Sequence, residues 1–296
     1  MSAAFLFPGQ GSESPTMGAS LLRRSARARE LLDRASRAVD LDLAAAVERG
    51  SPLLRRTEVT QAALLAIGLS LAEELERSGT VPAVVAGHSV GELAAFCVAG
   101  CLAAEDAVDA TARRGRLMAE AARLHPGGMA ALRVRSEAEV AAAVEVGLAE
   151  GPVDVAAHNA PGQWVLSGAG RALAAVAARF ATVPLPVAGP WHSRLMADAE
   201  RSWEADLRLL RWRPPRLALI ANRTGRLVGP EDDLPSLLSG QLTRPVRWAD
   251  TLRTAAELGV DSWHVLGPGR VLRALCRENL GPAAPVRVLD GAGARA

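Results

Sequence analysis

The sequence predicts an α/β protein with a largely parallel sheet and an inserted ferredoxin-like small subdomain. Short apolar runs bounded by glycine and proline alternate with longer helical stretches rich in alanine, leucine and arginine. Between Gly127 and Ala188 the expected order changes to strand, helix, strand, strand, helix, strand, which is the ferredoxin-like order. We therefore assign residues 1–126 and 189–296 to a large subdomain and residues 127–188 to a small one, with a cleft between them.

Each element follows from a local pattern. Residues 3–7 are an apolar run that Pro8-Gly9 ends, and 83–86 are a β-branched run that stops at Gly87. The expected strands of the large subdomain are 3–7, 83–86, 217–220 and 262–265, and its clearest helices are 60–76 and 92–100. The small subdomain is expected to have strands at 129–134, 153–157, 164–167 and 182–187, with helices from 136 and over 171–180.

Composition excludes several classes of function. The 34 basic and 32 acidic residues leave a net charge of +2, so no global charge favours nucleic acid or a membrane surface. All the basic residues are arginine, which excludes a Schiff-base lysine and a phosphate loop ending in Gly-Lys-Ser/Thr. Neither a signal peptide nor a run of about 18 apolar residues is found. Three cysteines, with Cys97 and Cys101 spaced as on one face of a buried helix, favour core thiols. We expect a cytoplasmic protein with no metal site.

The segment Gly87-His88-Ser89-Val90-Gly91 is a Gly-x-Ser-x-Gly pattern between a predicted strand and a predicted helix. In that context it is typical of a nucleophile elbow, in which the glycines permit a sharp turn and the serine lies at a helix N-terminus. The alternative is a plain structural turn, because the bare pattern also arises by chance. We favour Ser89 as a nucleophile.

A serine nucleophile needs a base within hydrogen-bonding reach, and the chain has five histidines. His88 adjoins the serine but should point elsewhere, and the other candidates include His125 in a predicted loop and His264 in a late strand. His192 lies where the insert rejoins the large subdomain, at the expected cleft. A lone histidine at such a position is more often structural, so position alone leaves its role open.

Further segments follow in an order that resembles a known family. They are Phe7-Pro-Gly-Gln10-Gly-Ser12, Gly87-His-Ser89-Val-Gly-Glu92, Arg114-Gly115 before Leu117-Met118, Gly127-Gly-Met-Ala130, Asn159-Ala-Pro-Gly-Gln163, His192-Ser193, Gln241 with Pro245-Val-Arg-Trp248, and Gly267-Pro-Gly269. The chain resembles the malonyl-CoA:acyl carrier protein transacylases, a family that includes the acyltransferase domains of polyketide synthases. The resemblance implies a hydrolase-like α/β large subdomain carrying the serine and a ferredoxin-like insert.

The resemblance also implies roles for individual residues. Ser89 would be the nucleophile and His192 its base, oriented by a backbone carbonyl near Gln241. The N–H groups of Gln10 and Val90 would form the oxyanion hole. Arg114 would pair with the carboxylate of a malonyl group, although it could instead belong to a solvated run with Arg113 and Arg116. The resemblance places Asn159, Trp191 and Gln241 in the substrate site as well.

The implied reaction moves a malonyl group from CoA through a Ser89 ester to the phosphopantetheine thiol of an acyl carrier protein, in polyketide or fatty acid biosynthesis. No bound cofactor is implied, since the CoA thioester and the phosphopantetheine are substrates. Carrier proteins are generally acidic, so arginines near the cleft are candidate contacts. Two clusters qualify, namely Arg208, Arg211, Arg213 and Arg216, or Arg270, Arg273 and Arg277.

One residue departs from the family pattern. Phenylalanine before the base histidine is common in users of malonyl groups and serine in users of methylmalonyl groups, whereas this chain has Trp191. The large ring would crowd an α-methyl branch, or it could mark a pocket rebuilt for another acyl group. Transfer of an aminoacyl or peptidyl group between carrier proteins, and hydrolytic editing of an acyl carrier, therefore stay open as alternatives.

Overall fold

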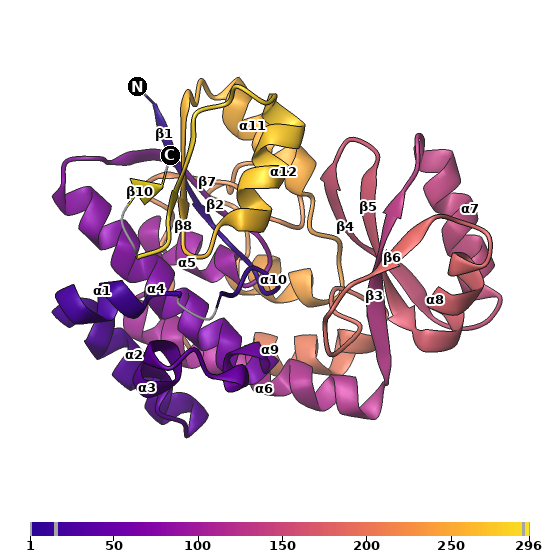
Figure 1. Ribbon diagram of the computed structural model, residues 1–296, viewed down its shortest axis with the longest axis horizontal. Coiled ribbons are helices and arrows are strands. Elements are labelled where there is room, and N and C mark those ends of the chain that lie inside the picture. Colours follow the sequence, from indigo (N-terminus) through magenta and orange to yellow (C-terminus); the bar gives the residue numbers. More distant parts are fainter. Residues whose placement is uncertain (1, 15–16, 292–293, 296) are drawn as a thin grey trace.

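Two sheets organise the chain in the computed structural model, which describes residues 2–14, 17–291 and 294–295 (Figure 1). Within those residues the large sheet has six strands in the order β10-β9-β8-β1-β2-β7, and every neighbouring pair except β10–β9 is parallel. Its strands are β1 (Ala3–Phe7), β2 (Pro82–Gly87), β7 (Ala218–Leu219), β8 (Ser262–Leu266), β9 (Val286–Leu289) and β10 (Ala294–Arg295). The predicted α/β fold with a largely parallel sheet is confirmed.

Helices cover the large sheet on both sides (Figure 1). The N-terminal half contributes α1 (Ala19–Arg24), α2 (Ala26–Val39), α3 (Leu43–Glu48), the 3-10 helix η1 (Pro52–Arg55), α4 (Thr57–Arg77), α5 (Gly91–Val98) and α6 (Ala104–Leu124). The C-terminal part adds η2 (Arg194–Met196), α9 (Ala197–Leu207), α10 (Leu234–Ser239), η3 (Gly240–Leu242), α11 (Trp248–Glu257) and α12 (Arg270–Leu280).

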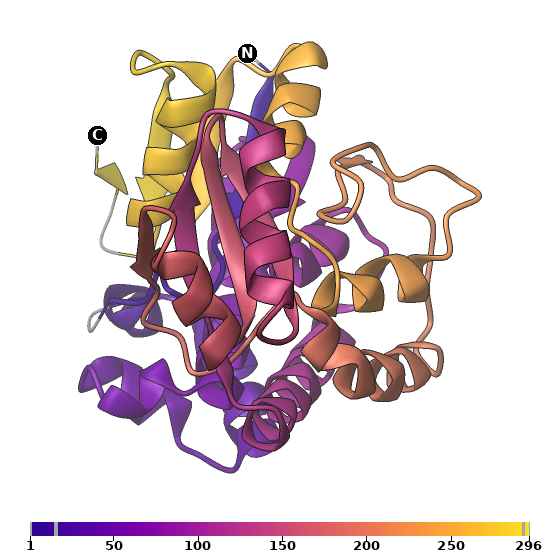
Figure 2. The same ribbon diagram turned by 90° about the vertical axis from the view of Figure 1, so that its right-hand side faces the viewer.

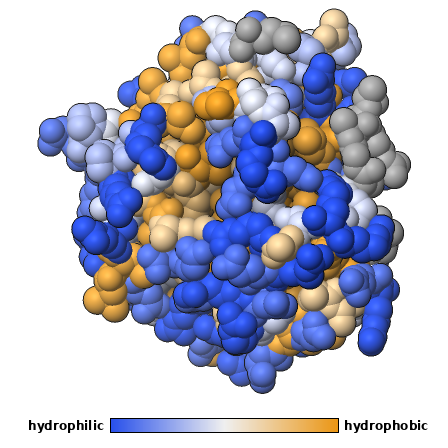
Figure 3. Space-filling model, turned by 90° about the vertical axis from the view of Figure 1, so that its left-hand side faces the viewer, coloured by the Kyte–Doolittle hydropathy of each residue, from blue (hydrophilic) through white to orange (hydrophobic). Residues whose placement is uncertain are grey.

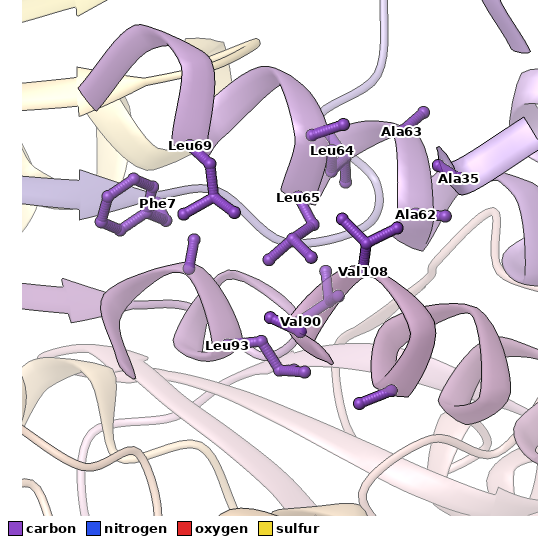
Figure 4. Packing of buried hydrophobic residues seen from close by; sticks show 14 of the residues in the cluster. Phe7, Ala35, Ala62, Ala63, Leu64, Leu65, Leu69, Val90, Leu93 and Val108 are labelled. Atoms are coloured by element: carbon purple, nitrogen blue, oxygen red, sulfur yellow. The ribbon is translucent and has the colours of Figure 1, made fainter. Parts of the chain in front are cut away.

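Alternation along the central strands sorts their side chains between the two covering layers. In β1, Phe5 and Phe7 belong to the core beneath α2, α4, α5 and α6, whereas Ala4 and Leu6 join the core beneath α11 and α12. Both sets are fully buried, as expected for a strand covered on its two faces. Figure 4 shows the first core from close by, with Leu65 and Leu69 of α4 facing the beginning of α5.

The small sheet lies entirely within the predicted insert. Its strands are β3 (Gly127–Arg133), β4 (Val153–Ala160), β5 (Gln163–Ala169) and β6 (Thr182–Pro184), in the antiparallel order β4-β5-β3-β6, and its helices are α7 (Glu137–Leu148) and α8 (Gly170–Ala177). Both helices cover the outer face of the sheet (Figure 2). The strand expected over 182–187 stops at Pro184: the N–H of Leu185 still donates to the carbonyl of Met129, but Pro186 has no N–H to continue the ladder.

Hydrogen bonds join the small subdomain to two parts of the large one, the segment that follows η3 and the helix α12. The backbone N–H of His158 donates to the carbonyl of Val246 at 2.9 Å, and the N–H of Val246 donates to the carbonyl of Ala156 at the same distance. The side-chain amide of Asn279 in α12 donates to the carbonyl of Asn159 at 2.8 Å. These contacts fix the small subdomain beside the loops that follow the strands of the large sheet.

The face opposite the small subdomain is largely hydrophilic in its lower part (Figure 3). On the outer helices Arg27 of α2 forms ion pairs with Glu73 of α4 and Glu105 of α6, and such exposed pairs contribute only about 0–1 kcal/mol each. In the described part of the chain, no helix is both long enough and apolar enough to pass through a bilayer. All three cysteines are free. The helix expected to carry Cys97 and Cys101 on one face ends at Val98, so the second thiol lies beyond it.

Candidate active site

Ser89 lies in a strained turn between β2 and α5. Its φ is 53°, the left-handed region that a residue with a Cβ rarely adopts. The flanking glycines are required by space: a Cβ on Gly87 would lie 2.0 Å from the carbonyl carbon of Gly91, and one on Gly91 would lie 2.2 Å from the carbonyl oxygen of Phe7. The backbone N–H of His88 also donates to that oxygen at 2.9 Å. Strand β1 thus packs directly against the turn that presents the serine, as the Gly-x-Ser-x-Gly pattern predicts.

His192 completes a hydrogen-bonded pair with the serine across 103 residues of sequence. Its Nε2 lies 2.8 Å from the Oγ of Ser89, and its Nδ1 lies 2.6 Å from the carbonyl oxygen of Gln241. Because a carbonyl oxygen can only accept, Nδ1 carries the proton and Nε2 is free to accept the serine proton. His192 also has a left-handed backbone, with a φ of 58°. The backbone carbonyl expected near Gln241 is that of Gln241 itself.

The imidazole of His192 is held in its neutral form. Burial lowers its pKa to about 3, and the positive charge of Arg114 acts in the same direction, while the carbonyl of Gln241 opposes them. The side chain is almost completely enclosed. A neutral ring is the form that can take a proton, so His192 has the protonation state that a general base needs at pH 7.

We expect the ring of His192 to remain neutral between pH 8 and pH 5, where a histidine in a peptide titrates near pH 6.5. The unfolded chain binds this proton more readily, so the stabilising contribution of the neutral ring falls as the pH drops from about 6.5 toward 3. Histidine ring nitrogens followed by NMR, with a His192→Gln variant for assignment, measure this directly. A midpoint near 6.5 for His192 would contradict the expectation.

The two backbone N–H groups predicted to form the oxyanion hole are not engaged elsewhere in the described part of the chain. Within the described residues no hydrogen bond is formed by the N–H of Gln10 or of Val90, whereas the N–H of Ser89 donates to the Oδ1 of Asn222 at 2.7 Å. The side chain of Val90 is buried beside Leu65 and Leu93 (Figure 4). Packing therefore anchors this residue at the start of α5. These two N–H groups are the predicted oxyanion donors, and that role stays a prediction.

Arg114 is buried on the inner side of α6. Its guanidinium donates to the Oε1 of Gln61 at 2.5 Å and to the Oε1 of Gln241 at 2.6 Å, and it approaches the Oγ of Ser89 at 3.4 Å. No described carboxylate forms an ion pair with it. Burial lowers its pKa to about 9, so it remains a cation at pH 7. A buried guanidinium without a carboxylate partner is costly, which indicates a site prepared for an anion.

The neighbouring arginines behave differently. Arg113 is half exposed and pairs with Asp206 of α9 at 2.8 Å, and Arg116 donates to a backbone carbonyl at the surface. The alternative that Arg114 is one of three solvated arginines is therefore wrong, because its side chain is buried. Only Arg114 of the three is enclosed, and it lies against the ring of Trp203 with 5.5 Å between guanidinium carbon and ring centre.

Asn159 and Trp191 are engaged with neighbours other than the reacting pair. The Oδ1 of Asn159 lies 2.9 Å from the Nε2 of His88, so it holds the residue before the nucleophile. Trp191 is 4% exposed, its ring lies against Gly189, and its Nε1 has no hydrogen-bond partner among the described residues. Their predicted roles in binding the substrate stay predictions.

Three further polar residues were not assigned from the sequence: Gln61, Glu92 and Asn222. Gln61 is a buried polar residue in the apolar helix α4, and Asn222 is a buried polar residue just after β7. A polar residue within an apolar segment is visible in the sequence and could have indicated a role for either one. Glu92 belongs to the motif around the serine, yet its partners come from distant segments. Burial raises its pKa to about 7, against the lowering effects of Asn222, Gln241 and Arg114.

The two predicted arginine clusters have different surroundings. Arg208 is already paired with Glu204 and Asp233. Arg270, Arg273 and Arg277 of α12 line a cavity of about 650 Å³ whose wall also includes Ser12, Ser14 and Asp290. Its wall includes Ser12, which follows β1, and Gly269, which follows β8. Because both strands run parallel in the sheet that includes β2, this cavity lies at the same edge of the large sheet as the nucleophile. No group of metal-ligating side chains occurs in the part of the chain that the structure describes.

Comparisons with known proteins agree with this geometry. Residues 4–266 match the family described as "Acyl transferase domain". The chain is 37% identical over 285 residues to the polyketide biosynthesis protein ThaF of Burkholderia thailandensis, covering 94% of this chain but only 24% of that protein. It is 32% identical over 284 residues to the malonyl CoA-acyl carrier protein transacylase of Bacillus subtilis, covering 93% and 89% of the two chains. The solved transacylase of Coxiella burnetii matches with a TM-score of 0.91 and 31% identity, over 98% and 94% of the chains.

Proposed function

Because the chain belongs to the acyl transferase domain family, we propose that it transfers a malonyl-type acyl group from CoA to the phosphopantetheine thiol of an acyl carrier protein. Its product would be used in polyketide or fatty acid biosynthesis. The observation that supports the choice of acyl group is the buried cation of Arg114, 3.4 Å from the Oγ of Ser89 and without a carboxylate partner among the described residues. A substrate carboxylate would supply that partner.

The first half-reaction forms an ester on Ser89. The Nε2 of His192 takes the hydroxyl proton as Oγ attacks the thioester carbonyl, and the N–H groups of Gln10 and Val90 donate to the oxygen that becomes negative. When the carbonyl re-forms, the C–S bond breaks and the CoA sulfur leaves with the proton from His192. The malonyl group is then held as an ester.

The second half-reaction reverses these roles. His192 takes the proton of the carrier's phosphopantetheine thiol, whose sulfur attacks the ester carbonyl. The C–O bond to Ser89 breaks, and the serine oxygen recovers the proton from Nε2. The reaction needs only these side chains and backbone groups, with the CoA thioester and the phosphopantetheine as substrates, so it requires no bound metal or redox cofactor.

The acyl group on Ser89 would lie beside Arg114, with its free carboxylate turned back onto the guanidinium. Its carboxylate would accept two hydrogen bonds from the planar guanidinium, in competition with the amide oxygens of Gln61 and Gln241. The ring of Trp191, next to His192, would leave little room for an α-methyl branch. We therefore expect unbranched malonyl to be preferred over methylmalonyl.

The carrier and the compartment are also part of the proposal. The cavity beside Arg270, Arg273 and Arg277 offers positive charge to the phosphates of CoA or to an acidic carrier protein. Its position at the edge that carries Ser89 is consistent with either substrate. Three free thiols are typical of a protein of the reducing cytoplasm, where we place the reaction.

Intact-protein mass spectrometry after brief incubation with malonyl-, methylmalonyl- and acetyl-CoA tests the proposal. We expect a malonyl adduct that disappears when phosphopantetheinylated carrier protein is added, with malonyl transferred to the carrier. No adduct from any CoA but one from an acyl carrier would favour transfer between carriers. An adduct that water removes as quickly as the carrier does would favour hydrolytic editing.

A further inference from the structure

The carboxylate of Glu92 is completely buried and connects two branches of the candidate active site. Its Oε1 accepts the backbone N–H of Asn222 at 2.7 Å, and its Oε2 accepts a hydrogen bond from the side-chain amide of Gln241. None of the described arginines forms a direct ion pair with it. A buried carboxylate is costly unless its acceptors are used, so its retention calls for a reason in the site itself.

The first branch fixes the nucleophile. The Oδ1 of Asn222 accepts the N–H of Ser89 at 2.7 Å, and its side-chain amide donates to the carbonyl of Gly87. One side chain therefore spans both sides of the strained turn. Glu92 holds Asn222 by its backbone, from the first turn of α5, the helix that follows the serine turn.

The second branch fixes the base and the cation. The Nε2 of Gln241 donates to Glu92 and, at 3.2 Å, to the carbonyl of Ser89, while its Oε1 accepts from Arg114 at 2.6 Å. Its backbone carbonyl accepts from His192. In its ionised form Glu92 can only accept hydrogen bonds, and it then holds the amide nitrogen of Gln241 toward itself and the amide oxygen toward Arg114.

We propose that Glu92 is a positioning residue that acts through Asn222 and Gln241, aligning Ser89, His192 and Arg114 with one another. The selectivity part of this inference rests on the proposed transfer of a malonyl group. The alignment of Ser89 with His192 does not depend on the identity of the acyl group.

The substitution Glu92→Gln separates the two branches. The new side chain has one acceptor oxygen in place of two, and the backbone N–H of Asn222 is fixed, so the new amide nitrogen would face the Nε2 of Gln241. Gln241 must then turn its amide, which points a donor at the guanidinium of Arg114 and gives up its bond to Ser89. The double variant Glu92→Gln with Gln241→Glu restores an acceptor both for the new amide nitrogen and for Arg114. Because that acceptor is a carboxylate that pairs with Arg114, the double variant should restore the alignment of the site but not its preference for a malonyl group.

Two kinetic quantities test the proposal in the full chain. The first is the malonyl-to-acetyl ratio, which is the single-turnover rate constant for acylation by malonyl-CoA divided by that for acetyl-CoA. The second is the rate constant for labelling by an alkyl fluorophosphonate, which reacts with an activated serine whatever the acyl donor. Neither depends on how much of the protein is folded, so a merely structural role would leave both unchanged. Glu145→Gln, at an exposed position of α7, is the control for loss of one negative charge.

In Glu92→Gln we expect the malonyl-to-acetyl ratio and the labelling rate each to fall about tenfold, and we expect the double variant to recover the labelling rate. If Glu92→Gln matches Glu145→Gln in both quantities, or if the folded double variant is labelled no faster than Glu92→Gln, the proposal is overturned. A wild-type protein that reacts with the fluorophosphonate but takes no malonyl group contradicts the proposed function instead. The labelling rate then decides on Glu92 alone.

Discussion

Replacing Ser89 by alanine is expected to abolish covalent acylation of the chain and to lower acyl transfer by about 10⁶-fold, the scale of loss when a serine hydrolase loses its nucleophile. The reason is that the Oγ is the atom within 2.8 Å of the neutral nitrogen of His192. Alanine removes that oxygen and leaves the backbone N–H at this position bonded to Asn222. Intact mass after incubation with the preferred acyl donor measures the adduct.

The exposed serine Ser78, at the end of α4, is a matched control for this experiment. Ser78→Ala removes one hydroxyl group far from the candidate site and should acylate at the wild-type rate. The assignment of the nucleophile would be sunk by a Ser89→Ala protein that still gains the mass of the acyl group. Thermal unfolding of both variants shows whether the fold is retained.

The fold was predictable because its signals are local. The run from Ala3 to Phe7 is apolar at every position and ends at Pro8-Gly9, and the structure has β1 over the same residues. The serine turn was predictable because two glycines are required on geometric grounds, and the structure confirms that neither has room for a Cβ. Short edge elements were less certain: the strand expected over 217–220 is reduced to Ala218–Leu219, since only two residues pair with β2.

The connections between the site residues were not predictable from spacing. Position alone left His192 as one of several candidates, and its assignment came from a family resemblance. Asn222 and Gln241 reach Glu92 across 130 and 149 residues, and no local pattern records such a contact. The amide orientations in this network follow from which groups can donate and which can only accept, and that becomes evident only when the atoms are placed together.

The second large effect concerns Arg114, whose removal should affect the choice of acyl group more clearly than it affects the fold. Removing the buried guanidinium removes the free energy spent on its desolvation, but it also leaves the Oε1 atoms of Gln61 and Gln241 without their donor and the buried Glu92 without a nearby cation. These effects on stability oppose each other and are the same whichever acyl group is offered. The same removal takes away the cation that a malonyl carboxylate would meet. A fall in the malonyl-to-acetyl ratio is therefore the expected signature.

For Arg114→Ala we expect malonyl acylation of Ser89 to fall by about 10² to 10³-fold, because a two-pronged charge-assisted pair is worth about 3–4 kcal/mol, while acetyl acylation falls far less. Arg114→Lys keeps a charge but lacks the planar fork that also bonds Gln61 and Gln241, so it should recover only part of the loss. Arg113→Ala, which removes the adjacent exposed arginine, should behave as wild type. Single-turnover rates with both CoA esters give the ratio, and thermal unfolding gives the stability. A malonyl-to-acetyl ratio that stays at the wild-type value in Arg114→Ala would mean that the buried cation serves the fold and not the acyl group.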